Sequence, residues 1–167
     1  GKKHELHSQV ISTSALNFES GSRSDDSKKL LVTSTQTLLS NIDWHRGGMG
    51  SAPKFPNPMT FTFLWRMAES GLLEDDLKEQ AKQAVLLTLT QMAQGGIFDQ
   101  LGGGFSRYSV DENWSVPHFE KMLYDNGLLL GLYSEVLLQK DLAPKTQELF
   151  LETVRATVTY VLREMTD

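Results

Sequence analysis

Helical segments with one apolar side alternate along this chain with helical segments that are apolar almost all round. The residue spacing predicts one-sided helices over 27–41, over 74–94 and from Pro144 onward. It predicts all-round apolar helices over 59–70 and 117–139. A one-sided helix can face water, whereas a helix that is apolar all round must be covered on every side. The alternation therefore predicts an all-α fold of outer and inner helices, as in part of an (α/α)6 toroid.

Residues typical of helix ends support the boundaries of the second helix. Asn57 is expected to cap its N-terminus, with Pro58 at the first helical position. Gly71 is expected to end it. By contrast, residues 1–26 are polar and serine-rich, and we expect a linker or poorly ordered arm there. Residues 27–167 are then expected to form the N-terminal portion of the toroid domain.

Composition excludes several classes of function. The net charge is −5 and no basic stripe is present, which argues against a nucleic-acid partner. No apolar run approaches the ~18 residues that a membrane span needs. The absence of cysteine excludes disulfides, thiolate metal sites and cysteine catalysis within this chain. We therefore expect no membrane contact, no metal and no cofactor, and a cytoplasmic setting.

Two glycine-rich runs occupy equivalent positions between the predicted helices. Each follows a one-sided helix and leads into an all-round apolar one, which indicates a repeat of about fifty residues. Up-and-down helices place both runs at the same end of the scaffold, where sites usually form. The second run also contains strand-like residues, which predict a small β-hairpin over 104–114 within a long loop. The two runs cover 47–58 (GGMGSAPKFPNP) and 102–126 (GGGFSRYSVDENWSVPHFEKMLYDN).

These motifs also carry a resemblance to a known family. The segments GGMGSAPKFPNPMT and GGIFDQLGGGFSRYSVDENWSVPHFEKMLYDN, with their spacing, resemble the thioredoxin-domain-containing proteins similar to spermatogenesis-associated protein 20. The resemblance covers 43–132. It implies a thioredoxin-fold domain followed by a toroid of the six-hairpin glycosidase type, similar to N-acylglucosamine 2-epimerases. Ser106 stands where the family usually has histidine, so an imidazole base is not expected at that position.

Three residues are candidates for catalysis: His118, Asp125 and Asp111. On the predicted fourth helix, His118, Lys121 and Asp125 share one face. His118 could act as general acid or base with Asp125 orienting it, or the group could simply cap the helix. Glycoside hydrolysis needs two carboxylates, and Asp111 with Asp125 is the pair that we consider.

Five further residues are candidates for substrate binding. Arginine and lysine side chains could bind sugar hydroxyls, and aromatic rings could stack on a pyranose face. The structural alternatives are an Arg107–Asp111 ion pair, aromatic packing under the loop and a solvated Lys54. The aspartates beside the glycine pairs, Asp43 and Asp99, are expected to make turn hydrogen bonds. The five candidates are Lys54, Arg107, Tyr108, Trp114 and Lys121.

Three functions remain open at this point. The resemblance implies a carbohydrate-related protein, either a sugar epimerase or a glycoside hydrolase, with a site at the glycine-rich rim. The toroid could instead be a non-catalytic docking platform for the thioredoxin-like domain of the parent chain, in a redox or protein-quality-control factor. In the third interpretation the glycine-rich loops only pack the helical hairpins together.

Overall fold

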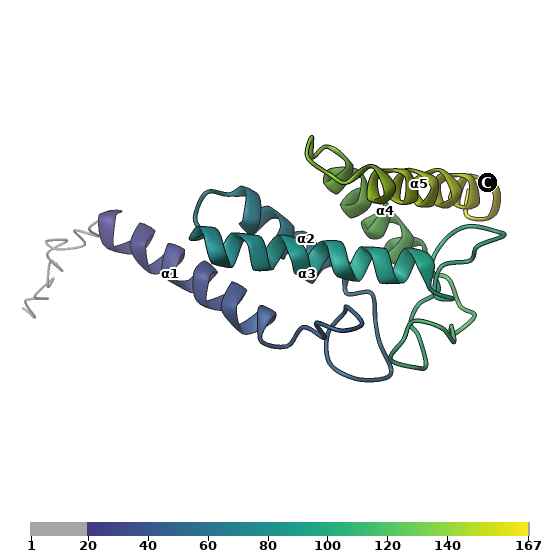
Figure 1. The fold of residues 1–167 in the computed structure, drawn as a ribbon, viewed down its shortest axis with the longest axis horizontal. Coiled ribbons are helices and arrows are strands. Elements are labelled where there is room, and N and C mark those ends of the chain that lie inside the picture. Colours follow the sequence, from purple (N-terminus) through teal and green to yellow (C-terminus); the bar gives the residue numbers. More distant parts are fainter. Residues whose placement is uncertain (1–19, 167) are drawn as a thin grey trace, which may run out of the picture.

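The computed structural model describes residues 20–166, and over these residues the protein is all-α. Short loops join α2 to α3 and α4 to α5, so these pairs form antiparallel hairpins. No helix in this part of the chain is long and apolar enough to cross a membrane. The described residues form five helices: α1 (Ser20–Leu39), α2 (Pro58–Glu69), α3 (Asp75–Gln94), α4 (Leu123–Leu137) and α5 (Pro144–Glu164) (Figure 1).

Contacts between alternate helices sort the five into two layers. Helix α3 packs against α1 and α5, whereas α2 packs against α4. The predicted one-sided helices therefore form one layer and the predicted all-round apolar helices form the other. This is the arrangement of a partial α/α toroid, as the sequence predicted.

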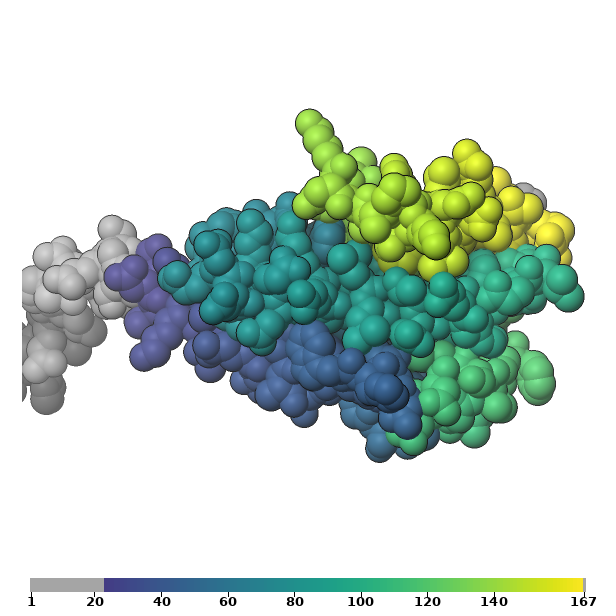
Figure 2. All heavy atoms as spheres, in the orientation of Figure 1, coloured from purple at the N-terminus to yellow at the C-terminus, as the bar shows by residue number. Residues whose placement is uncertain are grey.

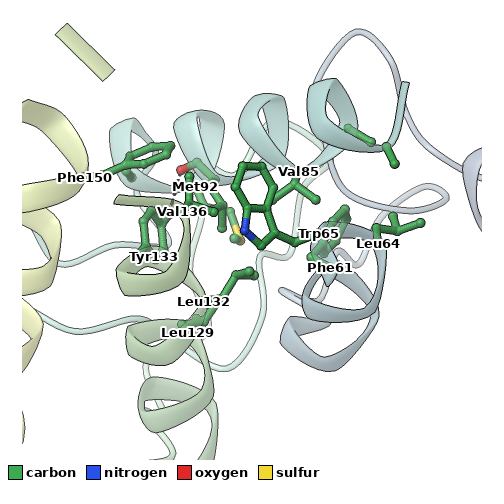
Figure 3. Close-up of a cluster of buried hydrophobic side chains, with 14 of the residues drawn as sticks. Phe61, Leu64, Trp65, Val85, Met92, Leu129, Leu132, Tyr133, Val136 and Phe150 are labelled. Atoms are coloured by element: carbon green, nitrogen blue, oxygen red, sulfur yellow. Dashed lines mark hydrogen bonds between the residues drawn. The ribbon is translucent and has the colours of Figure 1, made fainter. Parts of the chain in front are cut away.

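The core lies between the two layers, where α2, α3, α4 and α5 meet (Figure 3). The buried Tyr133 hydroxyl donates a hydrogen bond to the Leu89 carbonyl oxygen at 2.6 Å, which satisfies the one polar group of a large aromatic side chain. Figure 3 shows side chains from all four helices converging: Phe61, Leu64, Trp65, Val85, Met92, Leu129, Leu132, Tyr133, Val136 and Phe150.

Coverage of α4 is incomplete, contrary to the prediction from its apolar sequence. The side chains of Leu123, Tyr124 and Leu128 are exposed on one side of the helix. On the same side, a Cβ atom added at Gly127 or Gly131 would meet no atom within 4 Å. One apolar face of α4 thus has no neighbour among the described residues.

Helix α1 begins at Ser20, earlier than the expected start at residue 27. Serine disfavours helix only weakly, and helix formation is cooperative, so an established helix extends easily through this segment. Residues 20–26 of the predicted arm are therefore helical. Residues 1–19 lie outside the described residues.

The cap of α2 also differs from the prediction. Asn57 has a left-handed backbone with φ 45°, and its side chain makes no capping hydrogen bond. Its Nδ2 atom instead donates to the Phe55 carbonyl oxygen at 3.1 Å. Pro58 opens the helix as predicted, and Gly71 follows its C-terminus with φ +73°.

Helix α4 begins at Leu123, although the sequence predicted a start near residue 117. Residues 117–122 are extended because their backbone bonds to the preceding loop. The His118 N–H donates to the Tyr108 carbonyl oxygen at 2.9 Å, and the Arg107 N–H donates to the Glu120 carbonyl oxygen at 2.8 Å. The expected β-hairpin over 104–114 does not form: Phe105 and Ser109 make isolated bridges to residues outside this range, and no continuous strand forms within 20–166.

Candidate functional site

Both glycine-rich loops lie at the end of the molecule where α1, α3 and α5 end (Figure 1). In the first, Asp43 organises a tight turn over 43–48. Its Oδ1 atom accepts hydrogen bonds from the His45 and Arg46 N–H groups, both at 3.0 Å. The Gly47 N–H donates to the Asp43 carbonyl oxygen at 2.7 Å, and the Asp43 N–H donates to the Gly48 carbonyl oxygen at 2.9 Å. The predicted turn role of Asp43 is confirmed.

A fully buried lysine locks this turn. Lys54 Nζ donates to Asp43 Oδ2 at 2.6 Å and to the Gly47 carbonyl oxygen at 2.7 Å. It also lies 5.6 Å from the centre of the Trp114 ring. Lys54 was predicted to contact substrate, but its side chain has no exposed surface. Its ammonium group stabilises the loop from inside.

The second loop repeats this turn over 99–104. Asp99 Oδ1 accepts hydrogen bonds from the N–H groups two and three residues further on, at 3.0 and 2.8 Å. The Gly103 N–H donates to the Asp99 carbonyl oxygen at 2.9 Å, and the Asp99 N–H donates to the Gly104 carbonyl oxygen at 2.9 Å. The turn role predicted for Asp99 is confirmed as well. We call 43–48 and 99–104 the Asp–Gly–Gly turns.

A lysine locks the second Asp–Gly–Gly turn too. Lys121 Nζ donates to Asp99 Oδ2 and to the Gly103 carbonyl oxygen, both at 2.8 Å, and lies 4.3 Å from the centre of the Tyr160 ring. Lys121 was predicted to bind substrate from the same helical face as His118. It lies instead in an extended segment and is largely engaged by the turn.

The equivalent aspartates and glycines of the two turns are 56 residues apart, in the shared pattern Asp-x-x-x-Gly-Gly. Each turn rests on a helix of the outer layer. The Gly48 N–H donates to Thr88 Oγ1 of α3 at 2.8 Å, and Gly103 packs against the backbone of Ala156 in α5. The glycine-rich loops are therefore a structural repeat, each attached to the helix layer below it.

Acid is expected to weaken both turns. Burial raises the pKa of Asp43, but the Lys54 ammonium and two backbone N–H groups outweigh it and lower the pKa from 3.8 to about 2. The Gly102 N–H and the Lys121 ammonium lower the pKa of Asp99 to about 2 as well. A carboxyl whose pKa is lower in the folded state stabilises the fold above its unfolded pKa, and this stability is lost as the pH falls through the folded pKa.

The free energy of unfolding, measured in urea, should therefore be nearly constant down to about pH 5 and fall between about pH 5 and pH 2. Asp99→Asn should start from a lower value and fall less steeply over the same range. Asp141→Asn, at an exposed carboxylate between α4 and α5, should retain the wild-type slope. Equal slopes for the wild type and Asp99→Asn would contradict the role given to Asp99.

Trp114 is buried beneath the first Asp–Gly–Gly turn. Its indole Nε1 donates to the Arg46 carbonyl oxygen at 2.9 Å, and its backbone φ is +63°. A Cβ added at Gly48 would lie 2.4 Å from the Trp114 ring. The prediction that this ring stacks on a sugar is not supported, because its whole surface is covered by the loops.

Asp111 closes a turn of its own. Its carboxylate accepts hydrogen bonds from the N–H groups of Asn113, Ser115 and Val116. Burial raises the pKa of Asp111, but these N–H groups outweigh it and the pKa is lowered. Arg107 pairs with Glu120 at 3.4 Å, so the alternative Arg107–Asp111 ion pair does not form. Asp111 therefore stabilises a turn, a role that was not expected when Asp111 and Asp125 were considered as a catalytic pair.

His118 lies in the extended segment, so the predicted helical face with Lys121 and Asp125 does not form. Its ring stacks on Tyr108, with ring centres 4.6 Å apart and planes inclined by 17°. Tyr108 also contacts Phe55, at 5.0 Å between ring centres. His118 Nδ1 is buried and has no hydrogen-bond partner within the described part of the chain.

Asp125 lies in the first turn of α4 and is 9% exposed. Its carboxyl makes no hydrogen bond or ion pair with the described residues. Burial raises the pKa of Asp125, although the charge of Arg107 opposes this. Next to it, Asn126 bonds both to the N–H and to the carbonyl oxygen of Phe105, at 2.7 and 3.0 Å, and so fixes the second loop on α4.

The extended segment has a second face that the helix prediction missed. Pro117, Phe119 and Lys121 line a pocket of about 620 Å³, whereas His118 and Glu120 contact the preceding loop. Alternation along extended backbone explains this division. Within 20–166, no three His, Cys, Asp or Glu side chains lie close enough together to hold a metal ion.

Comparison with known proteins gives relatives of this chain. No family model matches the chain. It is 41% identical over 131 residues, or 78% of its length, to human spermatogenesis-associated protein 20. The mouse protein of the same name is 38% identical over 130 residues.

The chain is homologous to spermatogenesis-associated protein 20. It spans 16% of the length of the human and mouse spermatogenesis-associated protein 20 sequences. An uncharacterized protein of Caenorhabditis elegans is 46% identical over 99 residues, which are 58% of this chain and 13% of that protein. The names of these relatives state no reaction, so function has to be argued from the site itself.

Proposed function

We propose that the loop end of this chain forms one wall of a carbohydrate site, in a protein of sugar epimerase or glycoside hydrolase type. The observation that carries the proposal is Asp125 at the start of an inner helix, a residue that is 9% exposed and whose carboxyl keeps some contact with solvent but has no partner among the described residues. Largely covering an unpaired carboxyl costs free energy, and such groups concentrate at functional sites. The two Asp–Gly–Gly turns hold the glycine-rich loops rigid at the same end of the molecule.

The raised pKa of Asp125 suits a general acid, because the carboxyl keeps its proton to a higher pH than an ordinary aspartate. Asp111 is engaged in its own turn, so it is not free to act as the second carboxylate of a hydrolase. For an epimerase, His118 is the candidate base, since its Nδ1 atom has no partner within 20–166. We further propose a cytoplasmic setting, with a thioredoxin-like domain of the parent chain as a neighbour.

Asp125→Asn tests the proposal. The unfolding temperature of the intact protein is measured with glucose, mannose, galactose, N-acetylglucosamine, maltose and cellobiose. A sugar at about a hundred times its dissociation constant should add ~2.7 kcal/mol of stability to the wild type. In Asp125→Asn this increase should be lost, while the unliganded protein should be as stable as the wild type or more stable, because a charge penalised by burial has been removed.

Asp141→Asn serves as the matched control, since Asp141 is exposed and remote from the loop end. This variant should keep the full increase with sugar. An increase that survives in Asp125→Asn would remove Asp125 from the site. If no sugar stabilises the wild type, the carbohydrate proposal itself fails.

The uncovered side of α4 favours a second candidate function, docking of a protein surface. A groove of about 580 Å³ opens beside it, lined by apolar residues from α1, α2 and α4 that include Leu31, Met59, Phe63 and Leu128. Such a groove suits an apolar protein face more than a sugar. In that case the chain is a docking platform for the thioredoxin-like domain, and no sugar stabilises it.

A further inference from the structure

The pocket beside the second Asp–Gly–Gly turn has the properties of a small-molecule site. Its volume of about 620 Å³ lies within the range of roughly 300–1,000 Å³ that is typical of ligand pockets. It lies between the turn and the extended segment that precedes α4. The lining residues that matter for its chemistry are Phe98, Asp99, Ser106, Pro117, Phe119 and Lys121.

Ser106 provides a polar group without a partner. The residue is 5% exposed and lines the pocket, and its hydroxyl makes no hydrogen bond with the described residues. The hydroxyl oxygen is not fully covered, so it remains free to bond to water or to a ligand. A ligand in the pocket could both donate to and accept from this hydroxyl.

Phe119 provides an apolar surface at the rim. Its side chain is 92% exposed, and Leu101 on the facing turn is fully exposed. Pro117 lines the wall beside Phe119. An open aromatic ring next to a hydroxyl that has no protein partner matches a ligand that has an apolar face and a hydroxyl-bearing edge.

The charge of the lining is balanced. Its one carboxylate, Asp99, pairs with its one ammonium group, Lys121, at 2.8 Å. The pocket therefore has no net charge with which to attract an ionic ligand. Lys121 gives two of its three donors to the turn and lies over the Tyr160 ring, so it is held in place at the wall of the pocket.

We propose that this pocket is a subsite for a neutral pyranose, which stacks its C–H face on Phe119 and bonds through a hydroxyl to Ser106. This inference rests on the carbohydrate function proposed above and adds to it the class of sugar and the residues that bind it. It also assigns a role to Phe119, which was not a candidate for binding while residues 117–122 were expected to be helical.

Dissociation constants test the subsite, measured by ligand-observed NMR titration of the intact protein with the same six neutral sugars. Phe119→Ala should weaken binding about tenfold, since it removes the stacking surface. Ser106→Ala should weaken it about fivefold, since it removes one hydrogen bond. Neither variant should be less stable than the wild type, because Phe119 is exposed and the Ser106 hydroxyl has no partner to lose.

Val116→Ala is the matched control, because Val116 is exposed in the same segment but does not line the pocket. It should bind sugar as the wild type does. Wild-type affinity in both Phe119→Ala and Ser106→Ala would overturn the subsite, while loss of binding in Asp125→Asn would still support the wider site. No binding of any sugar by the wild type would overturn both.

Discussion

Gly103→Ala is expected to lower the free energy of unfolding by more than about 3 kcal/mol. Gly103 has φ +79°, which side chains avoid, and a Cβ there would lie 2.3 Å from the Ala156 carbonyl oxygen. That oxygen belongs to the backbone of α5 and cannot move aside as a flexible side chain can. The turn, the helix or both must shift, and urea unfolding of the variant measures the cost.

Gly71→Ala separates the two causes. Gly71 has a similar φ of +73°, but a Cβ there meets no atom within 4 Å. Only the backbone strain remains, so the loss should be about 1–2 kcal/mol. Equal losses at the two positions would mean that the close contact between the second Asp–Gly–Gly turn and α5 does not exist in solution.

Lys54→Met should cost about 3 kcal/mol or more. The lysine is fully buried, and its removal takes the ammonium donor away from Asp43 Oδ2 and from the Gly47 carbonyl oxygen. Methionine fills a similar volume, so the loss reports the interactions rather than a cavity. The measurement is again the free energy of unfolding in urea.

Lys145→Met, at an exposed lysine in the first turn of α5, provides the control and should change stability by less than about 0.5 kcal/mol. The comparison decides the role of Lys54. If Lys54→Met were as stable as the wild type but lost sugar binding, Lys54 would be a substrate contact, and the interpretation of the first Asp–Gly–Gly turn would be wrong.

The two-layer fold is predictable from the sequence because apolar spacing reflects which sides of a helix are covered. The turn roles of Asp43 and Asp99 are predictable for a similar reason, since an aspartate bonds to backbone a few residues ahead. Both inferences depend on local pattern alone. The start of α3 at Asp75, next to the predicted residue 74, was found in the same way.

Interactions between distant segments explain what the sequence did not reveal. Residues 117–122 have a helical pattern, but pairing with the 107–110 backbone holds them extended. This change moves His118 away from Lys121 and turns Phe119 toward the pocket. The lysines that lock the turns lie 11 and 22 residues beyond their aspartates, so no fixed spacing identifies them. The burial of Trp114 could not be predicted, because the close contact between Gly48 and the Trp114 ring forms only in the folded chain.

The central claim is that sugar binds at the loop end, where the segments around 43–57 and 95–122 form one continuous surface (Figure 2). The most direct test is to map the amide NMR shifts of the isotope-labelled intact protein as it is saturated with the tightest-binding sugar of the panel. The account predicts that the shifted amides cluster around Ser106, Phe119 and Asp125. Shifts confined to the exposed face of α4, or no shifts at all, would contradict it.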